Sequence, residues 1–437
     1  MSVVPRRDFL TQLGAGLAGV GAAPSLLAAE VARLSVPPVA DAPPERLAQD
    51  EAFWAGIRRA FDAPAGVVNL DHGNINPAPR AVIERHLRHV RETQQFPAQR
   101  MFALYQEVSQ RAVKPALARL LGVPDAEVAV VRNATEAMDT VLLGVPLKPG
   151  DEVVCSAHDY YAMLDALEQR RARDGIVLRM VRPPVPLPDA DALAALYERE
   201  IGPRTRLVLV THPSNLTGQL APVRRIADAA HRVGAELAVD GAQSMALVPY
   251  TMAELGCDYY GASLHKWLMA PVGAGVLWMR PAHVAKVWPL VPAPPHVQGI
   301  ERYSWSGTYP EHVLASALPA LELHERLGTA RKLARMRYLA GAFRARVAAL
   351  PGARLYTTDA PDASCGITTL ELPNVEAAAL QKFLWERHRI FVQDMSGDAR
   401  TPEIRGIRVT PNVYTTPGEL VRLADVLATV ARRGLGT

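Results

Sequence analysis

Residues 236–275, ELAVDGAQSMALVPYTMAELGCDYYGASLHKWLMAPVGAG, hold the pattern that decides the fold of this 437-residue chain. An apolar run ends at Asp240, Gln243 follows three residues later, and Lys266 stands 26 positions after Asp240. A glycine-rich turn over 273–275 then leads into a second apolar run. Short apolar runs of this kind are typical of buried strands. The polar groups at their ends indicate a cofactor site.

Lys266 is notable because lysine is rare in this chain. Lysine and arginine total 48, yet lysine occurs only at 114, 148, 266, 286, 332 and 382. Arginine stays protonated and is a poor nucleophile, whereas a lysine amine can form a Schiff base. A single lysine at a strand end is usually a surface residue, but the company of Asp240, Gln243, Ser263 and His265 favours a catalytic role.

Two of these segments resemble the cofactor site of a known family. Val239-Asp-Gly-Ala-Gln243 followed by Ser263-Leu-His-Lys266 is similar to the pyridoxal 5′-phosphate (PLP) site of class V aminotransferases, of fold type I. The resemblance covers roughly residues 65–430 and is strongest to the isopenicillin N epimerase-like and cysteine desulfurase-like branch. It implies that Lys266 holds PLP as a Schiff base and removes the substrate Cα proton. It also implies that Asp240 pairs with the pyridine nitrogen.

Strands and helices alternate from about residue 127 to residue 280, which predicts an α/β fold with a mostly parallel sheet and right-handed crossovers. The resemblance implies seven strands flanked by helices, with a smaller α+β domain. We expect four segments: a signal peptide over 1–29, an N-terminal arm and helix over 30–64, a large PLP-binding domain over 65–310, and a small C-terminal domain over 311–437.

The phosphate of PLP is expected where a helix starts after the strand 127–131. Asn133 is a good N-cap, and Glu136 stands at N3 as in a capping box. A helix N-terminus that follows a strand binds anions, although capping alone would explain both residues. The resemblance places further groups against the phosphate: Thr135, the backbone of Ala134, Ser263, His265 and, from a neighbouring subunit, Thr308.

Two more positions are expected around the PLP ring. The resemblance makes Tyr160 the aromatic residue that stacks on the ring, and a purely structural aromatic is the alternative. It also places Asn215 and Gln243 beside the phenolic oxygen. An asparagine in an ordinary turn would look the same as Asn215 in isolation.

The substrate side of the site is expected near Arg408. This residue resembles the family's carboxylate-binding arginine, which would hold the α-carboxylate bidentately; Arg405 is the weaker candidate. His72 and Asn74 lie in a turn that the family places at the mouth of the site. They are candidates for substrate contact, and capping of the turn is an equal alternative.

The resemblance implies an amino acid or amino-acyl substrate but leaves the reaction open. Reprotonation after loss of the Cα proton gives transamination or epimerisation, and departure of a β or γ group gives a C–S or other lyase. Cysteine desulfurases need a nucleophilic cysteine before the carboxylate arginine, and residues 390–400 contain none. A catalytically inactive PLP-fold binding protein and an α/β protein without PLP are further alternatives. The intact set of Asp240, Lys266 and Arg408 counts against an inactive protein. The expected function is an aminotransferase or an isopenicillin N epimerase-like enzyme, with a lyase as the alternative.

The composition limits which kinds of partner the protein is expected to bind. Hydrophobic residues make up 49% and charged residues 21%, a balance typical of globular proteins. The net charge of +4 comes from scattered arginines, and no basic block with interleaved aromatics predicts a nucleic-acid partner. Three cysteines give neither a disulfide framework nor metal-ligand spacing, so we expect no metal. The resemblance implies a homodimer with shared active sites.

The N-terminus predicts export. Arg6-Arg7-Asp-Phe9-Leu10 precedes a small-residue apolar run over 13–29, which resembles a twin-arginine signal. That route carries folded proteins, so PLP would be loaded before delivery to the periplasm. An uncleaved anchor is the alternative, although about 17 residues is short for a membrane span. We expect no stable span after removal of the signal.

Overall fold

The structure is a computed structural model and describes residues 37–39, 42–358, 360 and 363–436. The predicted twin-arginine segment over 1–29 lies outside these ranges. Among the described helices, none has both the length and the apolar character that a membrane crossing requires.

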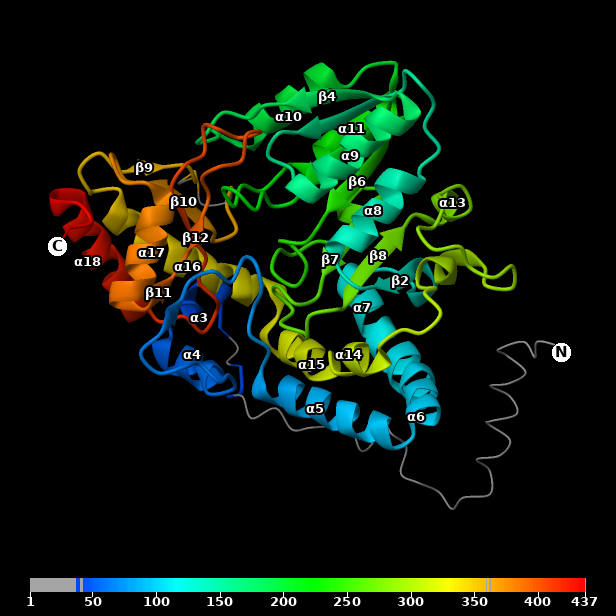
Figure 1. Cartoon of the computed structure of the whole chain (residues 1–437), viewed down its shortest axis with the longest axis horizontal. Helices are drawn as coiled ribbons and strands as arrows, with labels where there is room; N and C mark the ends of the chain where they lie inside the picture. The colour runs from blue at the N-terminus through cyan, green and yellow to red at the C-terminus, as the bar shows by residue number, and fades with distance from the viewer. Residues whose placement is uncertain (1–36, 40–41, 359, 361–362, 437) are drawn as a thin grey trace.

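Seven strands of the described chain form one sheet at the centre of the larger lobe (Figure 1). They are β2 (Val128–Val131), β3 (Glu152–Ser156), β4 (Val177–Val181), β5 (Thr205–Thr211), β6 (Glu236–Asp240), β7 (Tyr259–Ser263) and β8 (Gly275–Met279). Their order is β2-β8-β7-β6-β5-β3-β4, and only β8 runs against its neighbours. The mostly parallel seven-stranded sheet expected from the sequence is thereby confirmed.

Helices cover both faces of this sheet, which explains why its strands are apolar on both sides. In β5, Val208 and Val210 pack into one core, whereas Leu207 and Leu209 pack into the other. The first core is shared with η2 (Leu104–Val113, a π-helix), α7 (Lys114–Leu121), α10 (Ala190–Glu200) and α11 (Val223–Arg232). The second is shared with α8 (Ala134–Gly144) and α9 (Tyr161–Asp174). The carboxyl ends of the parallel strands therefore meet at one edge, where such sheets bind ligands.

The C-terminal part forms a second, smaller lobe, drawn at the left of Figure 1. Its antiparallel sheet has the order β12-β13-β10-β9. The bounds are β9 (Arg354–Leu355), β10 (Thr368–Glu371), β12 (Gln393–Asp394) and β13 (Ile407–Val409), with α16 (Thr329–Val347), α17 (Ala377–His388) and α18 (Pro417–Arg433) beside them. Thr416 and Glu419 form a capping box at the start of α18, which fixes where that helix begins.

Packing departs from the predicted domain boundaries at two places. β1 (Val68–Asn69) pairs in parallel with β11 (Ile390–Phe391), so the segment after residue 65 joins the C-terminal lobe. α14 (Glu311–Ala315) and the start of α15 (Leu318–Leu327) pack instead into the core of the large sheet. Both segments, β1 and α14 with the start of α15, therefore pack against the lobe on the other side of the predicted boundary. The boundaries at 65 and 310 stay predictions.

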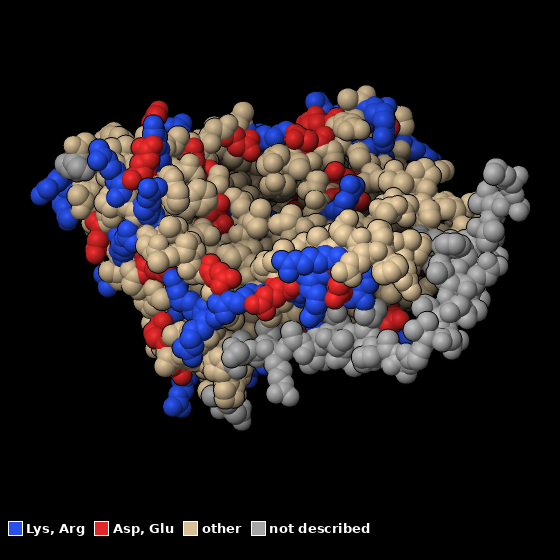
Figure 2. Space-filling view, turned by 60° about the horizontal axis from the view of Figure 1, so that its bottom comes forward, with Lys and Arg blue, Asp and Glu red and all other residues tan. Residues whose placement is uncertain are grey.

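The remaining elements connect or cover these lobes. They are α3 (Pro44–Leu47), α4 (Glu51–Arg58), α5 (Arg80–Gln95), α6 (Pro97–Ala103), η3 (Asp125–Glu127), α12 (Met252–Leu255), α13 (Pro281–Val284) and η4 (Gly299–Tyr303). Asp50 caps α4 by accepting a hydrogen bond of 3.0 Å from the Phe53 amide. Figure 2 shows basic and acidic side chains interspersed over the face that it draws, with no continuous patch of one sign.

Candidate active site

A pocket of about 300 Å³ lies at the carboxyl ends of the parallel strands. Eleven of the thirteen site residues predicted from the sequence line it. Those eleven are Asn74, Ala134, Thr135, Tyr160, Asn215, Asp240, Gln243, Ser263, His265, Lys266 and Arg408, and the pocket is completed by Ile75, Asn133, Met163, Thr211 and Ala242. Residues far apart in the sequence meet here because successive parallel strands end at the same edge of the sheet.

Lys266 follows β7 and is the amine of the pocket. Burial lowers the pKa of Lys266 to about 8, since a desolvated ammonium is disfavoured. The charge of Asp240 opposes this shift, Arg408 adds to it, and Asp71 opposes it. About a tenth of the amine is therefore neutral and nucleophilic at pH 7, far more than for an unperturbed lysine.

Asp240 ends β6 and is only 1% exposed. Its Oδ1 accepts a hydrogen bond of 3.0 Å from the Ala242 amide. Burial raises the pKa of Asp240, while that hydrogen bond and the charge of Lys266 act in the opposite direction. A buried carboxylate with one amide donor favours a cationic partner, such as a protonated ring nitrogen.

The N-terminus of α8 forms another side of the pocket. Asn133 caps the helix, and its Oδ1 accepts from the Glu136 amide at 2.8 Å. The Glu136 carboxylate bonds to the Arg132 amide instead of the Asn133 amide, so the predicted capping box does not close. The Ala134 amide donates to Ser263 Oγ at 2.8 Å, so that amide already has a protein partner. Ser263 keeps its hydroxyl proton for an anion beside Thr135.

Gln243 and Tyr160 border the middle of the pocket. The Gln243 Nε2 donates to the Gly73 carbonyl at 2.8 Å, and its Oε1 accepts from the Trp267 indole at 3.0 Å. One Nε2 proton of Gln243 remains for a ligand. Tyr160 occupies the N-cap position of α9 without a side-chain capping bond, and its ring packs against Tyr161 with centroids 4.4 Å apart. Burial raises the pKa of Tyr160, so its hydroxyl stays protonated.

Arg408 enters the pocket from β13 in the smaller lobe. Its guanidinium is 2% exposed and bonds to Asp71 Oδ1 at 2.9 Å and to the Asn215 carbonyl at 3.0 Å. Asn74 donates to the other Asp71 oxygen at 2.8 Å. A Cβ on Gly73 would lie 3.3 Å from the guanidinium, so the glycine leaves room for it. These contacts fix the guanidinium before any ligand binds.

Two predicted site residues lie elsewhere. His72 does not line the pocket: its ring is fully buried and packs edge-on against Tyr414, with centroids 5.6 Å apart. Burial lowers the pKa of His72 to about 3, so it is neutral. The turn directs the ring into the core, so the structure does not bring His72 to the pocket, and substrate contact by His72 stays a prediction. Thr308 is exposed and also lies outside the pocket of its own chain.

Polar atoms without hydrogen-bond partners indicate the kind of ligand that the pocket can bind. Within the described chain, four buried atoms of its lining lack a hydrogen-bond partner: Thr211 Oγ1, Asn215 Oδ1, His265 Nδ1 and Arg408 Nε. Buried polar groups in proteins nearly always have partners, so this pocket suits a polar ligand. A helix N-terminus for an anion, a carboxylate for a ring nitrogen and an amine for an aldehyde together fit PLP.

Two acidic residues beside the pocket were not among the predicted site residues. Asp71 pairs with Arg408, and its position directly before His72 in the turn already singled out was the available signal. Asp159 accepts from the Ser156 amide at 2.7 Å and from the Thr211 amide at 2.9 Å. Burial raises the pKa of Asp159 to about 7. It ties the loop before Tyr160 to the end of β5.

Comparisons with known proteins agree with this geometry. The family model "Aminotransferase class-V" matches residues 68–413. The isopenicillin N epimerase of Streptomyces clavuligerus is 30% identical over 400 residues, which are 86% of this chain and 98% of that protein. A probable cysteine desulfurase of Pseudomonas aeruginosa is 34% identical over 240 residues, 52% of this chain and 58% of that protein.

A solved structure gives the same fold. A variant of C-DES with glycine covalently linked to its PLP cofactor superposes with a TM-score of 0.75 at 24% identity, covering 85% of this chain and 98% of that one. The chain therefore belongs to the class-V aminotransferase family and uses pyridoxal 5′-phosphate as its cofactor.

Proposed function

We propose that this enzyme removes the Cα proton of an amino acid or amino-acyl substrate and returns it, as an epimerase or an aminotransferase does. The observation that carries the proposal is the placement of the Lys266 amine, the Asp240 carboxylate and the Arg408 guanidinium in one pocket. The similarity to isopenicillin N epimerase over nearly its full length supports an epimerase-like reaction.

Each group has a defined task in this proposal. PLP, when bound, acts as the electron sink that makes the Cα proton acidic. Lys266 Nζ binds the cofactor's aldehyde carbon and, once released, takes the Cα proton. Asp240 holds a proton on the pyridine nitrogen. Arg408 binds the substrate carboxylate through the N–H groups that Asp71 and Asn215 leave unused, including the unpartnered Nε–H.

The cysteines support this choice over cysteine desulfurase. Cys155, Cys257 and Cys365 are all buried and do not line the pocket. Burial raises the pKa of all three thiols, that of Cys365 to about 11, which suppresses the nucleophilic thiolate. The loop over 390–400 also has no cysteine.

A panel of amino acids and short amino-acyl compounds in deuterated water tests the proposal. Exchange of the Cα proton, followed by NMR, reports deprotonation whatever the outcome. Chiral chromatography then detects epimerisation, 2-oxo acid formation detects transamination, and sulfide release detects C–S cleavage. A PLP-loaded enzyme that exchanges no Cα proton in any compound would instead be an inactive binding protein.

The pKa of Lys266 predicts how cofactor loading depends on pH. Only the neutral amine attacks the aldehyde, and its folded-state pKa is about 8. The rate at which PLP-free protein gains the bound-cofactor absorbance should rise with pH and level off above about 8. Stopped-flow absorbance at constant ionic strength measures this profile.

Two variants provide opposite controls for that profile. Asp71 raises the pKa of Lys266 and Arg408 lowers it. Asp71→Asn should therefore move the midpoint to lower pH, and Arg408→Gln should move it to higher pH. A midpoint that stays fixed in both variants would assign the titration to PLP itself rather than to Lys266.

We propose further that the enzyme is a homodimer in which Thr308 reaches the PLP phosphate of the partner subunit. Thr308 is exposed and lies outside the pocket of its own chain, which supports a role across an interface. Thr308→Ala should weaken PLP retention by about 1.5–3 kcal/mol at most, the value of one charge-assisted hydrogen bond. Equilibrium dialysis of PLP measures the change.

Mixing variants tests the shared site directly. In a two-fold dimer of Lys266→Ala and Thr308→Ala chains, the intact Lys266 of one chain meets the intact Thr308 of the other. One site per mixed dimer should then be active and retain PLP as wild type does, whereas neither parent has such a site. Sedimentation of a fully active, fully loaded monomer would contradict the model.

We also propose export to the periplasm by the twin-arginine route, which rests on Arg6 and Arg7 before an apolar run. Changing both to lysine should leave folded, PLP-loaded protein in the cytoplasm. Cell fractionation followed by absorbance measures this, and periplasmic recovery of the double variant would rule the route out.

A further inference from the structure

A second lysine contacts the segment that carries the cofactor lysine. Lys332 lies on α16 and is only 1% exposed, in a chain where basic positions are nearly always arginine. Its Nζ donates a hydrogen bond to the Trp267 carbonyl, one residue after Lys266. Within the described chain no carboxylate pairs with Lys332. Burying an amine without a carboxylate partner lowers stability, so stability alone does not explain a lysine at position 332.

The backbone around Lys266 is held at three consecutive carbonyls. The His265 carbonyl accepts from the Asn76 amide at 3.0 Å, and the Lys266 carbonyl accepts from the Met269 amide at 3.1 Å. The third, that of Trp267, has Lys332 as its partner. Met269 has a φ of +63°, which is unusual for a residue other than glycine and makes the turn depend on its surroundings.

The same turn is linked to the substrate side of the pocket. The Trp267 indole donates to Gln243, and Gln243 donates to the Gly73 carbonyl. Gly73 packs against the Arg408 guanidinium. A shift of Trp267 would therefore disturb both the turn that carries Lys266 and the packing of Gly73 against Arg408.

The contacts explain why this position is a lysine. Arg335, one turn further along α16, is equally buried and satisfies its guanidinium with Glu51 and three backbone carbonyls. Lys332 has a single carbonyl acceptor. A guanidinium there would bury several N–H groups without partners, whereas the compact amine makes the one bond available.

We propose that Lys332 is a positioning residue that fixes the Trp267 carbonyl and thereby holds Lys266 in the geometry that attacks the cofactor aldehyde. Its loss leaves a buried carbonyl unpaired and lets the turn relax, so Lys266 is aligned for a smaller fraction of the time. The inference rests on the cofactor lysine and not on which reaction follows.

Lys332→Met tests the inference, because methionine fills the space without a donor. The rate of PLP attachment to the PLP-free protein, followed by absorbance, should fall tenfold or more. The kcat should fall with it, while KM for a turned-over substrate stays within twofold. Lys332→Gln keeps a donor on a slightly shorter side chain and should recover part of the attachment rate. Lys332→Arg should not recover it.

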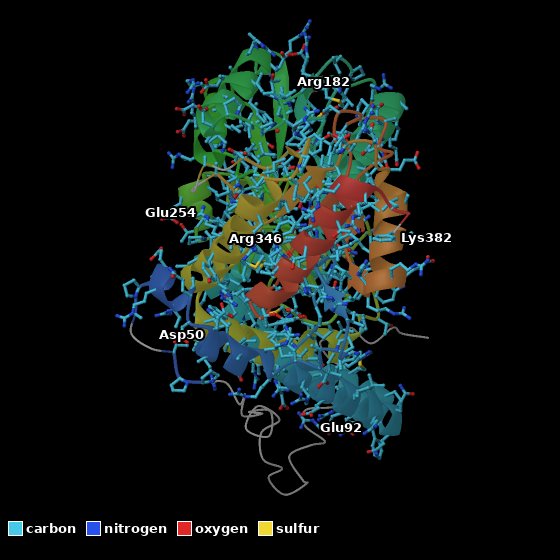
Figure 3. The ribbon with its side chains drawn as sticks, turned by 90° about the vertical axis from the view of Figure 1, so that its left-hand side faces the viewer. Asp50, Glu92, Arg182, Glu254, Arg346 and Lys382 are labelled. Atoms are coloured by element: carbon cyan, nitrogen blue, oxygen red, sulfur yellow. The ribbon has the colours of Figure 1, made fainter. Side chains whose placement is uncertain are left out.

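Two controls separate positioning from general stability. Lys382 points away from the protein on α17 (Figure 3), and Lys382→Met should leave the attachment rate unchanged. Val347→Ala opens a cavity at the far end of α16 and should lower the thermal midpoint without slowing attachment. A wild-type attachment rate in Lys332→Met would overturn the inference, as would equal slowing in Val347→Ala. If Lys332→Met does not fold, a wild-type or an arginine-like rate in Lys332→Gln overturns it.

Discussion

Lys266→Ala is expected to abolish nearly all turnover while leaving a folded protein that still binds PLP reversibly. A positioned general base contributes about 10²–10⁴-fold to a proton-transfer step, and this variant also loses the covalent bond to the cofactor. Lys266 lies at the pocket surface, so its removal opens space there and not in the core. Steady-state kcat and the visible absorbance of bound cofactor measure the two effects.

Borohydride reduction makes this result specific to one residue. In the wild-type protein, reduction should fix PLP to Lys266 as a secondary amine that peptide mapping locates. The chain has only five other lysines, so a different attachment site would be easy to recognise. A small primary amine added to Lys266→Ala should restore part of kcat if the lost group is the base.

Lys286→Ala is a matched control for the same measurements. Lys286 lies outside the pocket and pairs with Glu236 at the start of β6. Its kcat should stay within about twofold of wild type, since surface pairs contribute little. An adduct mapped to Lys286, or normal turnover in Lys266→Ala, would refute the assignment of Lys266.

The sequence predicted the sheet because its signals are local. The apolar runs that end at Val131 and Asp240, and the apolar run that follows the turn over 273–275, each became a strand of the central sheet. The polar followers of the first two runs then met at one edge by the geometry of parallel strands. The pairing of β1 with β11 was not predictable in this way, because it joins segments more than 300 residues apart and neither is longer than two residues.

The site was predictable where a residue's role follows from its position after a strand. It was not predictable where the direction of a side chain decides. His72 and Asn74 stand two residues apart in one turn, yet only Asn74 lines the pocket. The role of Asp71 depends on its hydrogen bond with Arg408, 337 residues away. The role of Lys332 depends on its hydrogen bond to the Trp267 carbonyl. Such pairings depend on how the two lobes pack.

Asp240→Asn is expected to retain PLP and lose most of its turnover. Burial alone raises the pKa of Asp240, so its ionised form depends on cationic neighbours. A protonated pyridine nitrogen is such a neighbour, and the pair stabilises each partner's charged form. Asparagine keeps the size and the oxygen that accepts from the Ala242 amide, so the fold and the cofactor contacts should survive.

The size of the loss follows from the energy of a buried pair. Removing one partner of a buried ion pair costs about 3–5 kcal/mol. If that energy is lost from the transition state, kcat falls by about 10²–10⁴-fold, at 1.36 kcal/mol per decade. The variant should still bind PLP and still be fixed at Lys266 by borohydride, because the amine and the phosphate contacts are intact.

Asp258→Asn distinguishes this loss from the general cost of changing a buried aspartate. Asp258 is 3% exposed and bonds to His231, His283, Arg280 and the Leu237 amide, all outside the pocket. These partners hold the pKa of Asp258 well below its usual range, so its change to asparagine should lower the thermal midpoint. Its kcat should remain near wild type. Wild-type turnover in Asp240→Asn, or an equal loss in both variants, would mean that Asp240 is not the partner of the ring nitrogen.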